Sequence, residues 1–100
     1  MKEESFGPII GIMKVTDDAT AVTLMNDTQY GLTASVYCNN EERALALQSQ
    51  LNAGTVYWNC CDRVSAALPW SGRKHSGFGS TLSLVGLRVF TQPKAYHLRS

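Results

Sequence analysis

Long hydrophobic runs are missing from this 100-residue chain, and so is a leader-like start. A membrane-spanning helix needs about 20 consecutive apolar residues, and every apolar stretch here is far shorter. The opening residues, Met-Lys-Glu-Glu-Ser, have no apolar core of the kind that a secretory signal carries. We therefore expect no membrane partner and a cytosolic compartment.

Cysteine is scarce, with only Cys38, Cys60 and Cys61 in the chain. Three cysteines cannot complete a disulfide framework, and neighbouring cysteines bridge poorly. No C-x-x-C pair occurs, and the two histidines do not stand at zinc-ligand spacing. The sequence thus predicts no metal site, and reduced thiols that pack or line a pocket.

Acidic residues are absent from residues 63–100, which hold six lysines and arginines. Residues 1–62 hold all eight acids and three bases, so the net charge of +1 divides into −5 and +6. A basic segment can meet nucleic acid or a phosphate-bearing cofactor, or it can be solvated surface. Because the bases are spread along the whole segment, we expect no nucleic-acid partner.

The amino-acid composition is typical of a folded globular protein. Hydrophobic residues make up 44% of the chain and charged residues 17%, which argues against disorder. A compact monomer of this length exposes roughly 5,600 Å² and buries about two-thirds of its unfolded surface. The length therefore allows one small core.

The first part of the chain alternates strand and helix patterns. Apolar or β-branched runs predict strands over 8–15, 33–38 and 54–59. The segments Thr16-Asp17-Asp18 and Asn39-Asn40 supply N-cap chemistry for helices that reach about residues 26 and 53. Ala44, Leu45, Leu47 and Leu51 are expected to form one apolar stripe. Gly31 is expected to end the first helix with a positive φ. This order is typical of an α/β fold, with a partial parallel sheet of three βαβ-connected strands.

The second part is predicted to be less regular. A long loop with several glycines spans 60–81, and loops of this length are usually functional. A short helix is expected over 82–88, followed by an extended segment that Pro93 restricts to a sheet edge or a free arm.

Three short motifs follow one another along the chain. They are Glu4-Ser5-Phe6-Gly7-Pro8, then Asn26 with Tyr30-Gly31-Leu32, then Gly54-Thr55-Val56 and Asn59 with the segment 69–79. At these spacings the chain closely resembles the C-terminal part of NAD(P)-dependent aldehyde dehydrogenases. That family reads E-x-F-G-P, N-x-x-x-Y-G-L, G-T-V-x-x-N and P-F-G-G-x-K-x-S-G-x-G. The resemblance covers residues 3–96, with Ser71 in place of a glycine and Trp70 in place of the phenylalanine.

The resemblance implies a cofactor contact at the first motif. Glu4 would bind the nicotinamide-ribose hydroxyls of NAD or NADP, and Phe6 would pack beside the nicotinamide. A carboxylate suits two hydroxyl donors, and an aromatic edge suits a flat ring. Without the family, a helix-cap glutamate and a core phenylalanine would be the simpler interpretation.

The resemblance also implies a substrate entrance in the loop between Asn59 and Pro69. The residues expected to line the aldehyde tunnel are Cys60, Asp62, Arg63, Val64 and Trp70. Arg63 could pair with an anionic substrate tail, or it could be an ordinary surface arginine.

The chemistry of the family needs groups that this sequence does not contain. A nucleophilic cysteine in a G-Q-x-C context and a general-base glutamate are absent, and Cys60-Cys61 stands in a different context. No G-x-G-x-x-G phosphate loop is present. We therefore expect no catalytic residue here, an inactive isolated chain without bound cofactor, and a parent that oxidises an aldehyde to a carboxylic acid.

The resemblance divides the chain into three segments of one catalytic domain. Residues 1–59 would be the βαβαβ part, 60–81 the entrance and glycine-rich loop, and 82–100 a short helix and oligomerisation arm. The expected partner is the remainder of an aldehyde dehydrogenase or a second copy. The alternative is a non-enzymatic module that self-associates through exposed strand edges.

Overall fold

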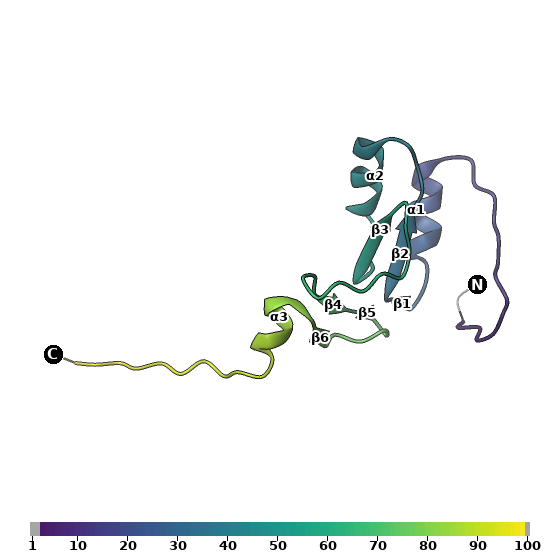
Figure 1. The fold of residues 1–100 in the computed structure, drawn as a ribbon. Helices are drawn as coiled ribbons and strands as arrows, with labels where there is room; N and C mark the ends of the chain where they lie inside the picture. The colour runs from purple at the N-terminus through teal and green to yellow at the C-terminus, as the bar shows by residue number, and fades with distance from the viewer. Residues whose placement is uncertain (1–2, 100) are drawn as a thin grey trace.

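The computed structural model describes residues 3–99, so Met1, Lys2 and Ser100 of the predicted segments 1–59 and 82–100 lie outside the described residues. The described chain has two regions with different amounts of regular structure (Figure 1). Residues 18–58 form an α/β lobe. Residues 59–99 form a tail of short elements that ends in an extended arm.

The two longer helices begin at the predicted caps. α1 (Asp18–Asn26) follows Asp17, whose carboxylate accepts a 2.8 Å hydrogen bond from the Thr20 amide. α2 (Glu41–Gln48) follows Asn40, whose side-chain oxygen accepts a 2.8 Å bond from the Arg43 amide. Each cap satisfies an amide that lacks a partner inside its helix.

Helix α2 is shorter than the sequence predicted. After Gln48, the amides of Gln50 and Leu51 bond to carbonyls three residues back, at 3.0 and 3.2 Å. This tighter turn ends the α-helical pattern and leads the chain toward the next strand.

One predicted strand pair is confirmed. β2 (Thr33–Val36) and β3 (Thr55–Trp58) are parallel, with Thr33 opposite Thr55 and Val36 opposite Trp58. Helix α2 connects them, which makes a βαβ unit.

The third parallel strand, predicted over 8–15, is not formed. Residues 8–15 carry no strand assignment, and Ile9, Ile10 and Ile12 are 67, 84 and 92% exposed. A strand exists only where a neighbour pairs with its backbone, and within residues 3–99 no segment pairs with this one. The prediction of a buried strand over 8–15 was therefore wrong for this chain.

A small core joins the helices to the sheet. Val36, Ala44 and Leu51 form its centre, at 9, 0 and 8% exposure, with Val22 and Val56 packed against them. Leu45 is 58% exposed, so the prediction that it shares the buried stripe was wrong. It points away because α2 contacts the core through Ala44 and Leu47, and Leu51 of the following turn joins them.

The loop predicted over 60–81 contains three two-residue strands. β5 (Arg73–Lys74) pairs antiparallel with β1 (Tyr30–Gly31) of the lobe. β4 (Trp70–Ser71) pairs antiparallel with β6 (Ser80–Thr81). These pairs fold the glycine-rich segment against the lobe rather than leaving it irregular.

The predicted short helix is present as α3 (Ser83–Arg88), and the segment after it is an arm. The alternative of an edge strand over 89–97 was wrong, because these residues pair with no described strand. Figure 1 shows the arm running from α3 away from the lobe.

The chain is extended. It exposes 8648 Å², against roughly 5,600 Å² for a compact monomer of this size. Its radius of gyration is 17.9 Å, against about 13 Å for a typical 100-residue domain. The expected two-thirds burial is therefore not reached. No helix within residues 3–99 is long and apolar enough to cross a membrane.

Candidate functional site

The three sequence motifs meet at one pocket of about 290 Å³. Glu4 comes from the first motif, Asn26 and Tyr30–Leu32 from the second, and Ser76 from the third. These residues are far apart in the sequence, and the fold brings them together. The pocket is therefore the candidate site of the chain.

Asn26 ties the end of α1 to the turn before β3. Its amide nitrogen donates to the Gln50 carbonyl at 2.9 Å, and its side-chain oxygen accepts from the Asn52 amide at 2.8 Å. One side chain thus satisfies both a backbone carbonyl and a backbone amide of a segment that has no regular structure. Asn26 builds the wall of the pocket.

Lys74 and Ser76 bind the third motif to the same wall. The Lys74 ammonium donates to the carbonyls of Asn26 and Thr28 at 2.8 and 2.9 Å, where α1 ends. Cations at a helix C-terminus satisfy carbonyls that have no partner inside the helix. The Ser76 hydroxyl accepts a 2.9 Å bond from the Gly31 amide.

Sequence reasoning did not give these three residues a role of their own. The signal was their fixed place in the second and third motifs, because polar residues at motif positions commonly fix loop geometry. The contacts join residues 24 to 48 positions apart in the sequence, which no local pattern reveals.

Gly31 is needed for close approach and not for a positive φ. It lies in β1, and a Cβ built on it would stand 2.5 Å from the Asn52 carbonyl oxygen. The predicted positive φ was wrong, because the chain passes through Gly31 as a strand rather than as a helix-ending turn. Gly54 is similar, since an added Cβ would overlap the Ser71 carbonyl.

The structure places Glu4 and Phe6 differently. Glu4 is exposed and lies on the pocket. Phe6 is 92% exposed and does not line the pocket. The simpler interpretation does not hold for either residue, because Phe6 is outside the core and the first described helix begins only at Asp18.

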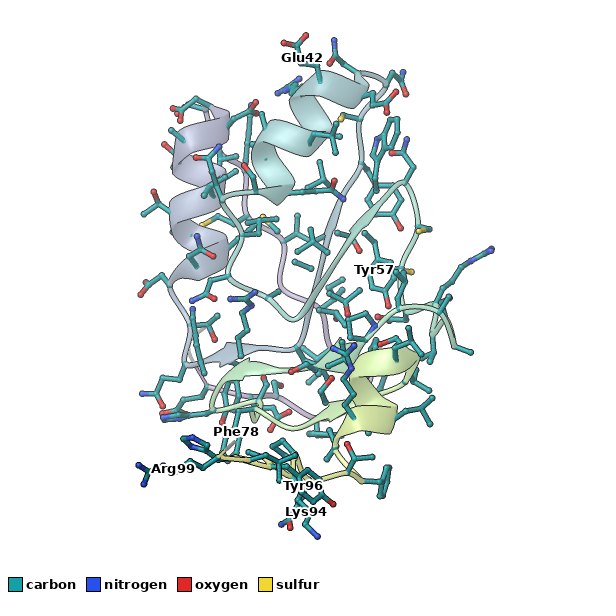
Figure 2. The ribbon with its side chains drawn as sticks, turned by 90° about the vertical axis from the view of Figure 1, so that its left-hand side faces the viewer. Glu42, Tyr57, Phe78, Lys94, Tyr96 and Arg99 are labelled. Atoms are coloured by element: carbon teal, nitrogen blue, oxygen red, sulfur yellow. The ribbon has the colours of Figure 1, made fainter. Side chains whose placement is uncertain are left out.

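A tight loop after β3 holds four of the five expected entrance residues. Asn59, at φ 52°, anchors its start through 3.0 Å bonds with both the amide and the carbonyl of Cys38. The Tyr57 hydroxyl donates to the Arg63 carbonyl at 2.9 Å and closes the loop. Figure 2 shows Tyr57 beside the chain that follows β3.

The expected entrance residues differ in exposure and lie in two different parts of the tail. Cys60 is half-buried, whereas Asp62, Arg63 and Val64 are exposed, Val64 by 64%. Trp70 is half-buried in β4 and pairs with Thr81. The structure thus groups Cys60 to Val64 in one loop and sets Trp70 in a separate strand pair.

Two tyrosines beside this loop have a raised pKa. The pKa of Tyr37 lies above its usual value, chiefly because its hydroxyl is hydrogen-bonded to the Cys61 side chain. The pKa of Tyr57 is also raised, first by loss of solvent and then by the nearby charge of Asp62. Both phenols therefore stay neutral near pH 7.

The pocket fits part of a nicotinamide cofactor and not the whole. An exposed carboxylate at the pocket is a suitable acceptor for ribose hydroxyls. A pocket of about 290 Å³ is at the lower limit for one small ligand, and a dinucleotide needs more. The described residues therefore form no complete dinucleotide site, and Glu4 is the residue whose chemistry suits a cofactor contact.

Comparison with known proteins identifies the family. The sequence profile of the aldehyde dehydrogenase family matches residues 1–96. An aldehyde dehydrogenase of Emericella nidulans is 40% identical over 98 residues, which are 98% of this chain and 20% of that protein. Aldehyde dehydrogenase 1A1 of Oryctolagus cuniculus is 41% identical over 93 residues, or 93% of this chain and 19% of that protein.

Solved structures agree. Succinic semialdehyde dehydrogenase of Streptococcus pyogenes, in complex with NADP+, matches with a TM-score of 0.91 and 32% identity, over 98% of this chain and 22% of that one. Betaine aldehyde dehydrogenase of Staphylococcus aureus, in complex with NAD+, matches with a TM-score of 0.85 and 34% identity, over 89% of this chain and 18% of that one. The chain spans about a fifth of the length of these relatives. On its sequence and on its fold, this chain belongs to the aldehyde dehydrogenase family.

Proposed function

We propose that this chain is the C-terminal part of the catalytic domain of an aldehyde dehydrogenase. The whole enzyme would oxidise an aldehyde to a carboxylic acid with NAD+ or NADP+. The observation that carries the proposal is the pocket where all three motifs meet, with Glu4 on its rim. Segments 1–59, 60–81 and 82–100 would then be its βαβ part, its entrance and glycine-rich loop, and its subunit-contact arm.

Glu4 would hold the cofactor by its ribose. Its carboxylate can accept hydrogen bonds from two adjacent hydroxyls, and charged acceptors form the stronger bonds. The contacts of Asn26 and Lys74 hold the wall of the pocket in place, so the Glu4 carboxylate lies beside a fixed surface. The exposed ring of Phe6 is available to lie against the nicotinamide.

The cofactor, when bound, supplies the acceptor for the hydride that leaves the substrate carbon. The residues of this chain position it and shape the access route. The nucleophilic cysteine and the general base that the reaction needs belong to motifs outside this sequence. We therefore propose that the isolated chain neither turns over aldehyde nor retains NAD(P)+.

The loop from Cys60 to Val64, together with Trp70, would line the substrate entrance. Arg63 is exposed on this loop and would pair with an anionic substrate tail. Replacing Arg63 by alanine in an enzyme carrying this segment should raise KM selectively for acidic aldehydes. An equal loss for neutral and acidic aldehydes would show that Arg63 is an ordinary surface residue.

A second candidate function rests on the exposed apolar surface. The side chains of Ile10, Ile12 and Phe90 are 84, 92 and 90% exposed, and exposed apolar side chains favour association. A self-associating module without activity would use it. A concentration-independent monomer in light scattering would contradict this alternative.

The cytosolic compartment and the lack of a nucleic-acid partner stay predictions.

The proposed function is tested by a segment exchange. Residues 3–96 would replace the matching segment of the Emericella nidulans aldehyde dehydrogenase, to which this chain is 40% identical. The exchange should retain activity, and Glu4→Gln in it should raise KM for NAD+ about tenfold or more, since a hydrogen bond to a charged group contributes about 1.5–3 kcal/mol.

Glu3→Gln is the matched control, because Glu3 is the neighbouring exposed carboxylate and does not line the pocket. Equal effects of Glu3→Gln and Glu4→Gln on KM would refute the cofactor role of Glu4. A separate assay of the 100-residue chain with NAD+ and an aldehyde should give no NADH absorbance.

A further inference from the structure

We propose that Cys60 and Cys61 form a dithiol site that binds trivalent arsenicals, with both sulfurs bonded to one arsenic atom. The site lies on the loop after β3, and the proposal does not depend on aldehyde oxidation or on a cofactor. It rests on the accessibility of the two thiols, on how the loop holds them, and on what adjacent cysteines can bridge.

The doublet is accessible, and the third cysteine is less so. Cys61 is exposed and Cys60 is half-buried. Cys38 is half-buried too, but its sulfur lies 3.2 Å from the Asn40 carbonyl and donates to it. A reagent in solution therefore meets the doublet before it meets Cys38.

The loop holds the doublet at both ends. Before it, Asn59 is fixed to Cys38 by two 3.0 Å hydrogen bonds. After it, the Arg63 carbonyl is held by the Tyr57 hydroxyl at 2.9 Å. Only three residues, Cys60 to Asp62, lie between the two anchored positions, so Cys60 and Cys61 have little freedom to separate.

The doublet lies beside two tyrosines. The Tyr37 hydroxyl is hydrogen-bonded to the Cys61 side chain, and the Tyr57 hydroxyl donates to the Arg63 carbonyl two residues further along the loop. Because the two cysteines are adjacent and their loop is anchored on both sides, their sulfurs can reach one common atom, as bonding to arsenic requires.

A disulfide between adjacent cysteines is geometrically disfavoured. A disulfide needs an S–S distance of about 2.05 Å and usually a Cα separation of about 4.4–6.8 Å, whereas adjacent Cα atoms are about 3.8 Å apart. A bridging atom removes this restriction because the sulfurs then need not touch. Soft centres prefer thiolate ligands. Within residues 3–99, no three His, Cys, Asp or Glu side chains form a metal-holding group, so the ligand must be satisfied by two sulfurs.

The binding step is a condensation without redox change. With an arsenical of the type R–As=O, each thiol sulfur forms one S–As bond and the As=O bond breaks. The two thiol protons leave with the oxide oxygen as one water molecule. Arsenic stays trivalent, so no oxidant or reductant is consumed.

The test uses phenylarsine oxide and the whole 100-residue chain. Intact mass should show one reagent added per chain with one water lost, and the thiols available to a thiol reagent should fall from three to one. Excess 2,3-dimercaptopropanol should reverse the adduct. Its release by a competing monothiol should be about 100-fold faster from Cys60→Ser or Cys61→Ser, because the second bond is intramolecular only in the parent.

Cys38→Ser is the matched control and should release the reagent at the parent rate. Loss of the adduct in Cys38→Ser, or parent-like release from either doublet variant, would overturn the proposal. The parent chain should bind the reagent both in buffer and in guanidinium, because the two cysteines stay adjacent when the chain unfolds. An adduct that forms only in guanidinium would overturn the proposal, since the folded loop would then hide the thiols. The measurement in guanidinium also compares the variants when one of them fails to fold.

Discussion

The lobe, residues 18–58, and the tail, residues 59–99, obtain their shapes in different ways. Every hydrophobic side chain that is buried within residues 3–99 lies in the lobe. All five described non-glycine residues with positive φ lie in the tail: Asn59, Asp62, Lys74, Leu82 and Ser83. The lobe is held by its own core, whereas the tail depends on backbone turns and on contacts with the lobe.

The charges of the two regions differ as well. Glu42 on α2 lies at the opposite end of the molecule from Lys94 and Arg99 on the arm (Figure 2). The Glu42 carboxylate therefore does not neutralise the positive charges of the arm at close range. The arm keeps its positive charge available, with Lys94 placed 5.2 Å from the ring of Tyr96.

The largest effect should come from the core of the lobe. Leu51→Ala removes a side chain that is 8% exposed and should lower the free energy of unfolding by about 2–5 kcal/mol. Leu84→Ala in the tail, where Leu84 is 72% exposed, should change it by less than about 0.5 kcal/mol. Urea unfolding followed by circular dichroism measures both. Equal losses would remove the distinction between the two regions.

The joint between the regions should be the next most sensitive place. Gly54→Ala puts a methyl group into the Ser71 carbonyl of β4 and should cost about 1–3 kcal/mol. Hydrogen exchange in residues 70–81 should also speed up, because this contact holds the tail to the lobe. Gly79→Ala, with nothing within 4 Å of the added Cβ, is the control and should leave exchange unchanged.

A smaller effect is expected at the start of α2. Asn40→Ala removes the side-chain cap of the Arg43 amide and should destabilise the lobe by about 1 kcal/mol. Asn39→Ala changes the same residue type one position earlier, outside the cap, and should be nearly neutral. If both variants unfold at the same urea concentration, the cap does not support the lobe.

The smallest effect is a pH dependence of the lobe. The pKa of Asp18 lies below its usual value of 3.8, chiefly because Arg43 donates hydrogen bonds to its carboxylate at 2.5 and 2.7 Å. A carboxyl with a lowered folded pKa contributes stability above its unfolded pKa and loses it as pH falls through the folded pKa. Both side chains are about half exposed, so solvent screens the pair.

Asp18→Asn should therefore unfold slightly more easily than the parent at pH 7, and the difference should shrink as the pH falls below 3.8. Thermal unfolding at pH 7 and pH 3 measures this. A difference that grows toward low pH would show that the Arg43 contact does not stabilise the folded lobe.

The elements of the lobe could be predicted because their signals are local. The caps at Asp17 and Asn40 and the β-branched run at 54–59 depend on near neighbours in the sequence. The strand over 8–15 could not be predicted correctly, because a strand also needs a pairing partner. Of the candidate site, the motifs indicated Glu4, whereas the Asn26 and Lys74 contacts depend on distant segments.

The sequence is enough to recognise the family, the two capped helices, the parallel strand pair and the division of charge. These follow from residue types at short spacings. The folded molecule is needed to see that the three motifs share one pocket, that Gly31 serves close approach, and that residues 8–15 and 89–99 pair with no described strand. Burial and strand pairing depend on which distant segments are present to make the contact, and no local pattern of residues contains that information.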